Sequence, residues 1–285
     1  MNTHSHRLTV HPFLACLLAA VLPCAATAQD MPPDAPSIQA MSPLDPTPAT
    51  PLRGVAVSVG GHQLSNGYGH WRDAKLSGVY GVGAHVWQAE LAAKREFGES
   101  GLFLGVSDTV TLSPDWYTSL SVGAGDGAFY LPRLRADAAL YKKWLAAQNF
   151  VTSVGLGYYR APDGHIDRAL NLGAVWYFEQ PWIAEAGVRL NRSNPGQIHT
   201  QQRFVALTYG RALQDMVTLR YGSGGEGYQS IGAQAALVNF KSHQTGLSWK
   251  HWVTPQGGVQ LSLERYRNPY YSRNGVALAF FQDFN

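Results

Sequence analysis

Residues 116–125 read WYTSLSVGAG, and this short stretch shows the pattern that decides the fold. Trp116, Leu120 and Val122 alternate with small or polar residues such as Ser119 and Ser121, so the apolar period is two residues. A period of two is typical of a β-strand with one apolar face, whereas an amphipathic helix has a period near 3.6. The same alternation recurs along the chain, at 87–97, 150–158, 182–190 and 259–264. No segment predicts an amphipathic helix.

Turn signals divide this region into strands and fall into two alternating sets. Six short turns are centred on 81–83, 113–115, 146–149, 179–181, 211–215 and 254–257. Seven mostly longer connections cover 65–70, 98–101, 125–132, 161–165, 191–197, 222–241 and 268–274. This arrangement gives about fourteen strands with both ends on the short-turn side, as in a closed antiparallel transmembrane β-barrel of the bacterial outer membrane. Counts of 12 or 16 stay open, because apolar Ala235–Val238 within 222–241 could form an extra hairpin arm.

Composition excludes several other classes of protein. The 285 residues include 22 Lys and Arg against 19 Asp and Glu, which leaves no basic excess for a nucleic-acid partner. Apolar residues make up 45% of the chain and charged residues only 14%, which argues against disorder. After residue 28 no run of 18 apolar residues remains, so a helical membrane protein is excluded.

The N-terminus predicts a secretory signal peptide over residues 1–28. Arg7 precedes an apolar run, Phe13–Ala28, which ends in the cleavage pattern Ala26-Thr27-Ala28. Residues 29–52 hold seven prolines and predict a periplasmic linker, with a docking strand for a partner as the alternative. Residues 53–285 then form the barrel, and both cysteines fall within the predicted signal peptide.

Period two alone does not distinguish a barrel in lipid from a soluble sandwich, and the tryptophans favour lipid. Seven of them lie near the short turns, where they predict an interfacial aromatic girdle because an indole is apolar yet hydrogen-bonds at one edge. They are Trp87, Trp116, Trp144, Trp176, Trp182, Trp249 and Trp252. Seven tyrosines lie near the other rim, namely Tyr68, Tyr130, Tyr158, Tyr159, Tyr266, Tyr270 and Tyr271. Asp108 falls on an apolar face, which predicts either a bulge or a place near a rim.

The last strand has an apolar stripe of Val276, Leu278, Phe280 and Phe284. This resembles the terminal-strand signature that the barrel assembly machinery reads, although Gln282 interrupts the stripe and Asn285 follows the final aromatic. We therefore expect the outer-membrane lipid and the assembly machinery to be partners of this protein.

The stretches WYTSLSVGAG, FYLPRLRADAALYKKW, FVTSVGLGYYR and MVTLRYGSGGEGY, together with the last strand, resemble the YaiO-type outer-membrane β-barrel family over about residues 53–284. The resemblance rests on strand patterning and spacing. It implies an outer-membrane location and a connection with surface exopolysaccharide, so polysaccharide is an expected partner. It supplies no catalytic residues.

Alternation also predicts which polar residues line the lumen. They are Asp73, Lys75, Gln88, Glu90, Lys94, Arg135, Asp137, Lys143, Glu185, Arg189, Arg220, Lys250 and Glu264. Because both signs of charge are represented, no ring of one sign is expected. The set suits either a polar conduit for a neutral or weakly anionic solute, or cross-strand ion pairs that brace the interior.

We expect no enzyme, no cofactor and no metal. The histidines are scattered, none lies in a hydrolase or zinc motif, and His243 beside Ser242 is the least poor catalytic candidate. Three functions stay open: a channel or accessory barrel for exopolysaccharide export or solute passage, a structural or adhesive barrel with a plugged lumen, and a lipid-modifying enzyme.

Overall fold

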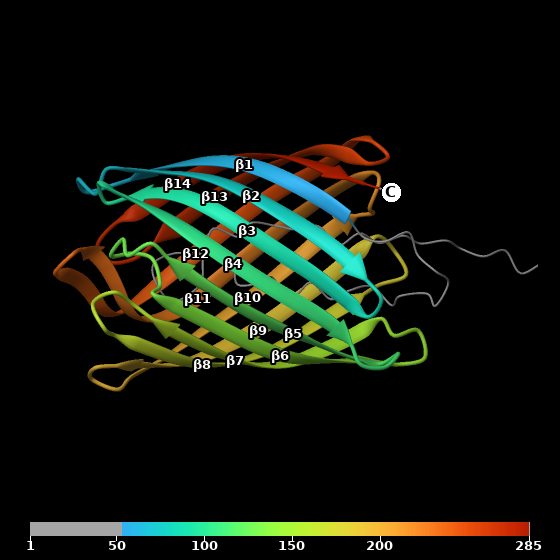
Figure 1. Ribbon diagram of the computed structural model, residues 1–285, viewed down its shortest axis with the longest axis horizontal. Helices are drawn as coiled ribbons and strands as arrows, with labels where there is room; N and C mark the ends of the chain where they lie inside the picture. Colours follow the sequence, from blue (N-terminus) through green and yellow to red (C-terminus); the bar gives the residue numbers. More distant parts are fainter. Residues whose placement is uncertain (1–52, 285) are drawn as a thin grey trace, which may run out of the picture.

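The computed structural model describes residues 53–284, so the predicted signal peptide and proline-rich linker lie outside the described residues. The described chain forms one closed barrel of fourteen antiparallel strands (Figure 1). The strands are β1 (Arg53–Leu64), β2 (His70–Val82), β3 (His85–Glu96), β4 (Glu99–Thr111), β5 (Trp116–Gly125), β6 (Leu134–Trp144), β7 (Phe150–Arg160), β8 (Ile166–Tyr177), β9 (Trp182–Asn194), β10 (Ile198–Gly210), β11 (Asp215–Gly232), β12 (Ala235–Thr254), β13 (Gly257–Arg267) and β14 (Ser272–Asp283). Within this part of the chain, no helix is long and apolar enough to span a membrane.

The barrel closes through pairing of its first and last strands. β1 pairs with β14 antiparallel from Gly54 opposite Asp283 to Leu64 opposite Arg273. Every described strand therefore has two hydrogen-bonded neighbours, which removes the free edges that would otherwise pair with other chains. The predicted count of fourteen is confirmed.

The two ends of the barrel differ as predicted, with one exception. The chain enters β1 and leaves β14 at the end that carries the six short turns, on the right in Figure 1. The predicted loop over residues 222–241 is wrong, because β11 continues to Gly232 and β12 begins at Ala235. The two strands form a ribbon that extends past the wall at the opposite end, so the apolar segment Ala235–Val238 is a hairpin arm that adds no strand to the count.

The outer face is apolar along the middle of nearly every strand. Leu104, Leu156 and Leu219 are each more than half exposed, and similar residues surround the barrel. A soluble monomer rarely exposes an apolar patch of more than a few hundred Å², so a continuous apolar band requires lipid around it.

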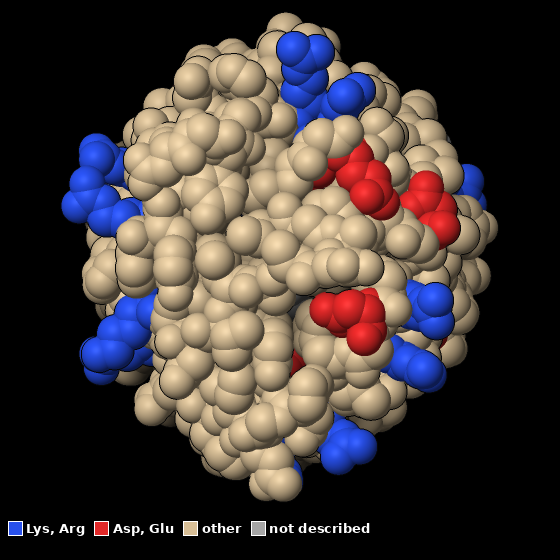
Figure 2. Space-filling view, turned by 90° about the vertical axis from the view of Figure 1, so that its left-hand side faces the viewer, with Lys and Arg blue, Asp and Glu red and all other residues tan. Residues whose placement is uncertain are grey.

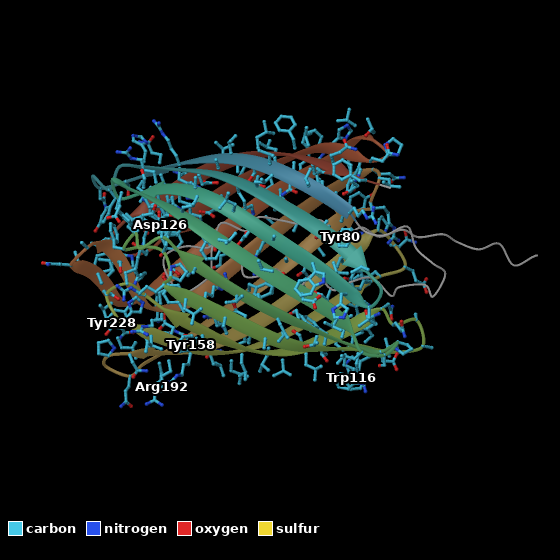
Figure 3. All side chains as sticks on the ribbon, in the orientation of Figure 1. Tyr80, Trp116, Asp126, Tyr158, Arg192 and Tyr228 are labelled. Atoms are coloured by element: carbon cyan, nitrogen blue, oxygen red, sulfur yellow. The ribbon has the colours of Figure 1, made fainter. Side chains whose placement is uncertain are left out.

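Six of the seven predicted girdle tryptophans lie outside the barrel near the short turns, between 37% and 45% exposed, as Trp116 illustrates (Figure 3). The indole of Trp144 donates to Thr152 Oγ1 at 2.8 Å. The placement of Trp252 in the girdle is wrong. It lies three residues from Trp249, an odd number, so the alternation of the strand turns it inward, where it is buried.

The tyrosines at the other rim divide between the two faces. Tyr270 is exposed, whereas Tyr130, Tyr159, Tyr266 and Tyr271 are buried inside the barrel. The aromatic belt at this end is therefore mainly internal.

Asp108 lies near the short-turn rim of β4, and β4 has no register shift against β3 or β5. Its Oδ2 atom is 2.7 Å from Nδ1 of His85, whose ring stacks on Trp87. Of the two explanations for Asp108, the rim position holds and the bulge does not.

Candidate functional site: the lumen and its outer mouth

The inner wall is polar, and strand alternation places all thirteen predicted lumen residues on it. Within the barrel wall, each has the strand parity opposite to that of the exposed aliphatic residues of its own strand. They are Asp73 and Lys75 on β2, Gln88, Glu90 and Lys94 on β3, Arg135, Asp137 and Lys143 on β6, Glu185 and Arg189 on β9, Arg220 on β11, Lys250 on β12 and Glu264 on β13.

Several of these charges have a partner of opposite sign. Nε of Arg135 donates to Asp137 at 2.7 Å, two residues along the same strand. Asp73 lies opposite Lys94 in the register of β2 and β3, and its Oδ1 atom is 3.4 Å from Nε2 of His62. Ion pairing within the wall reduces the cost of placing these groups inside the barrel.

Other cations lie over aromatic rings. Lys250 Nζ is 4.1 Å from the ring centre of Phe281 and 4.5 Å from that of Trp252. Arg220 lies 3.5 Å from the ring centre of Phe204. Ring faces attract cations and exclude water, so these contacts hold the side chains against the wall.

A further internal ion pair involves a residue that is not among the thirteen predicted lumen residues. Arg273 of β14 is 1% exposed, and its Nε atom donates to Glu264 Oε1 at 2.9 Å. Its guanidinium also lies 4.6 Å from the ring centre of Trp71. Arg273 was not predicted to line the lumen because residues 268–274 were assigned to a loop. Its odd spacing from the outward-facing residues of the last strand would have placed it on the inner face.

The extended β11–β12 ribbon makes contacts on two sides of the outer mouth. On one side, Tyr228 donates to the carbonyl oxygen of Pro195 at 2.7 Å and stacks on His165 with the ring centres 5.1 Å apart. On the other side, Leu237 and Phe240 are buried in a cluster with Leu64, Trp71, Tyr266 and Tyr271. The ribbon is thus held from both sides below its tip, and residues 233–236 at the tip itself are exposed.

Buried hydrogen bonds connect the ribbon to the β13–β14 wall. Tyr266 donates to Glu226 Oε1 at 3.0 Å, and Gln229 Nε2 donates to the Tyr271 hydroxyl. Asn268 donates to Tyr266 at 3.1 Å and accepts from the backbone N–H of Tyr271 at 2.8 Å. Burial raises the pKa of the Tyr271 hydroxyl, so this group stays neutral. Each partner is a polar group that would be costly to bury alone.

The β5–β6 connection, residues 126–133, also folds inward. Tyr130 and Leu131 are buried against Phe103, and the Tyr130 hydroxyl donates to the carbonyl oxygen of Lys94 at 2.8 Å. Gly101 faces this loop, and a Cβ atom there would lie 2.6 Å from Cβ of Ala128. The absence of a side chain at Gly101 is what lets the loop pack against the wall.

A chain of aromatic contacts runs from the β13–β14 connection, which is hydrogen-bonded to the ribbon, to the β5–β6 connection. Tyr271 contacts Tyr68, Tyr68 contacts Phe97, and Phe97 contacts Phe129, with ring centres between 4.9 and 6.2 Å apart. Viewed along the axis from this end, side chains cover most of the mouth and leave only a narrow hollow (Figure 2). The outer mouth is narrow in this state.

Ser242 and His243, the pair considered as a catalytic candidate, do not form a catalytic site in the structure. Ser242 is buried on the inner face, whereas His243 is exposed on the outer face, where its Nδ1 is 2.9 Å from the Tyr221 hydroxyl. Consecutive strand residues face opposite sides, so Ser242 and His243 cannot act as a pair. Among residues 53–284, no three His, Cys, Asp or Glu side chains gather as metal ligands would.

A closed, even-stranded barrel with an apolar outer band, a tryptophan girdle and a polar interior defines the class of bacterial outer-membrane β-barrels. The sequence model of a protein family, the YaiO membrane beta barrel domain, matches residues 53–229, which is more than half of the chain. The chain belongs to the YaiO outer-membrane β-barrel family, as the sequence predicted. The protein accordingly resides in the bacterial outer membrane with lipid around its wall.

Solved structures with the same fold include channels. A monoaromatic hydrocarbon channel, the TodX deltaS2S3 mutant, gives a TM-score of 0.56 at 10% identity over 82% of this chain and 90% of that chain. A structure titled bacterial polysaccharide outer membrane secretin gives 0.54 at 10% identity over 81% and 98%. Likenesses at this identity establish the fold alone. No curated protein matches the sequence.

Proposed function

We propose that this protein is a gated outer-membrane conduit for a neutral, hydroxyl-rich solute such as a segment of exopolysaccharide. The observation that supports this proposal is a polar inner wall of mixed charge beneath a mouth that a strand ribbon covers. A scaffold barrel could share the polar wall, so the argument for a conduit rests on the ribbon, which is held over the mouth as a separate element and could move away from it.

The charge pattern favours a neutral solute over an ion. Rings of one sign select for ions of the opposite sign. Here the predicted lumen set has seven cations and five anions, with Arg135 paired with Asp137 at 2.7 Å and Asp73 opposite Lys94 in the strand register. Such a wall offers donors and acceptors without a net field of either sign.

The mouth favours a carbohydrate over a fully polar solute. Tyr68, Phe97 and Phe129 are only partly buried, and Tyr68 contacts Tyr271, which is hydrogen-bonded to Gln229 of the ribbon. A sugar ring has an apolar face and a rim of hydroxyl groups, which matches this combination.

The ribbon is the proposed gate, and its removal tests the proposal in planar bilayers. One variant replaces residues 227–239 with Asn-Gly, a two-residue turn that suits a hairpin. We expect brief, rare openings from the full chain and a steady current from the variant. A neutral oligosaccharide should reduce that current more than an anionic oligosaccharide of equal length does. If the variant folds, as its gel migration before and after boiling would show, yet passes no current, the conduit is wrong.

A second candidate is a structural or adhesive barrel with a plugged lumen, as the buried bonds between the ribbon and the β13–β14 wall suggest. In that case deletion of residues 224–239 abolishes attachment of cells to a surface, and neither form conducts. A current through the ribbon-deleted barrel therefore indicates a conduit, whereas loss of cell attachment without any current indicates an adhesive barrel.

We also propose that the barrel assembly machinery recognises the last strand. Val276, Leu278, Phe280 and Phe284 all face outward on β14 or just beyond it and are exposed. Phe284→Asp should lower the amount of folded barrel in cells without affecting refolding of the purified chain in detergent. Equal amounts in cells would contradict this role.

A further inference from the structure

Exposed cations surround the outer wall at the long-loop end. Nine strand residues that face outward there are basic, and we call them the basic belt: Arg72, Arg95, Arg160, Arg168, Arg192, Arg203, Lys241, Arg265 and Arg267. No outward-facing strand residue at this end is acidic in the part of the chain that the structure describes. Figure 2 shows Lys and Arg mostly around the periphery of this end, with Asp and Glu nearer the centre.

The belt is specific to one end of the barrel. At the short-turn end, the outward-facing strand residues Arg53 and Lys142 are offset by Asp108 and Asp215. Lys142 there is also held over the rings of Trp116 and Trp144. The positive charge is therefore concentrated on the side of the membrane that faces the cell exterior, where the longer loops of such barrels lie.

Within the belt, like charges lie directly opposite each other. Arg72 is the register partner of Arg95, and Arg168 is the register partner of Arg192. Like charges in directly opposed positions destabilise a sheet. Of these four residues, Arg192 donates a side-chain hydrogen bond to Gln197 at 2.9 Å, which does not place a negative charge between the arginines. An anion between the guanidinium groups would turn this repulsion into attraction.

The belt contains a hollow with a defined lining. His243, Thr245, Arg265 and Arg267 surround a shallow cavity of about 210 Å³ on the outer wall of β12 and β13. His243 lies opposite Arg267, and Thr245 lies opposite Arg265, so two cross-strand pairs form its floor. All four side chains are exposed.

The lining is suited to a tetrahedral oxyanion. A guanidinium group presents a rigid fork of N–H donors that binds phosphate oxygens in pairs, and a threonine hydroxyl adds a donor. The Tyr221 hydroxyl bonds to Nδ1 of His243 at 2.9 Å, which leaves Nε2 of that ring to face a ligand. No carboxylate is among the lining residues to oppose an anion.

The position of the hollow indicates that the anion belongs to a lipid. Leu247 and Leu263 lie two residues deeper on the same strands, face outward and are exposed in the apolar band. The hollow thus lies where acyl chains end and headgroups begin. Basic residues at this level attract anionic headgroups.

We propose that the hollow formed by His243, Thr245, Arg265 and Arg267 binds the phosphate group of a phosphorylated lipid headgroup in the outer leaflet. The rest of the basic belt gathers the same lipid around the barrel. This site lies on the outside of the wall and does not depend on conduction through the lumen.

Lipid retention by the folded full chain in detergent tests the proposal. Bisphosphorylated lipid A and the same glycolipid without phosphates are titrated into the protein, and bound lipid is counted by native mass spectrometry. We expect the phosphorylated form alone to bind in a salt-sensitive way, and Arg265→Gln/Arg267→Gln to weaken it about tenfold or more. Arg53→Gln, at the short-turn end, is the matched control and should bind as the unaltered chain does.

Three outcomes overturn the site. They are equal binding of the two glycolipids, no loss in the double variant, and an equal loss in the Arg53→Gln control. Inorganic phosphate provides a further arm: if it competes with lipid A at equal concentration, the hollow binds a free anion and the lipid assignment is wrong. Migration before and after boiling verifies that each variant is folded.

Discussion

Gly101 and Gly125 make room for the inward-folded β5–β6 loop. A Cβ atom on Gly101 would lie 2.7 Å from Cδ1 of Leu131, and one on Gly125 would lie 2.5 Å from Cβ of the same residue. Neither distance is compatible with a side chain, because packed carbon atoms stay more than 3 Å apart. The shape of the mouth therefore depends on two residues that have no side chain.

Gly101→Val should displace the loop from the wall. Overpacking of this kind costs about 1–3 kcal/mol, and the loop can relieve the clash by moving into the mouth or out of it. We expect limited proteolysis of the variant to cleave within 126–133, where the unaltered chain is protected. Gly67→Val, in an exposed turn with open space around it, has its own backbone strain but no packed loop to move. Identical protection of 126–133 in all three forms would contradict this account.

Arg273 has a different role, since it neutralises a buried charge. Arg273→Met leaves Glu264 inside the wall without its cation, and removing one partner of a buried pair costs about 3–5 kcal/mol. Urea unfolding in zwitterionic vesicles measures this loss of free energy. Lys241→Met, an exposed position of the basic belt, should change stability by less than about 0.5 kcal/mol. A loss no greater than that of the control would show that the pair is not needed.

Most of the inner wall could be predicted from the alternation of side chains along each strand. Once one residue of a strand is known to face outward, the odd or even spacing of every other residue from it gives the face on which that residue lies. That reasoning placed Arg135 and Asp137 on one face, where the structure pairs them. It failed at Trp252, which was grouped by distance from a turn instead of by parity, and at Arg273, which was assigned to a loop. The pairing of specific side chains depends on register, which a single strand does not reveal.

At the level of elements, the glycine-rich segment of β11 misled the sequence analysis. Residues 222–227 were included in the predicted connection over 222–241, which is rich in glycine. In the structure Gly224 belongs to a paired strand, and a Cβ atom there would lie 2.2 Å from the carbonyl oxygen of Gln201. Glycine is used here for close approach of two backbones. Tertiary contact of this kind has no signature in local composition.

The two faces of one strand give an element-level prediction. Leu120→Arg places a cation on the outer face of β5, in the apolar band, where it should cost about 2–4 kcal/mol. Ser121→Arg, one residue on, places the same cation on the inner face opposite Asp137 and should cost far less. Urea unfolding of both variants in vesicles measures the difference. Equal losses would mean that the two faces of β5 meet the same solvent.

For the whole molecule, closure and asymmetry were both readable from turns and periodicity. Fourteen strands with short turns at one end were predicted, and β1 pairs with β14 as a closed barrel requires. The folding of the ribbon and of residues 126–133 into the mouth could not be predicted, because it depends on contacts such as Tyr228 with Pro195 across far segments of the chain. The sequence therefore predicted the wall better than the mouth.

The central claim is that hydrocarbon, and not water, covers the outer face. The most direct test compares the migration of the purified chain on a detergent gel before and after boiling, once it has been folded either in lipid vesicles or in buffer without detergent. We predict a folded, differently migrating band only from the vesicle sample, with aggregation in buffer. A chain that is folded and monomeric in buffer without lipid or detergent would contradict the account.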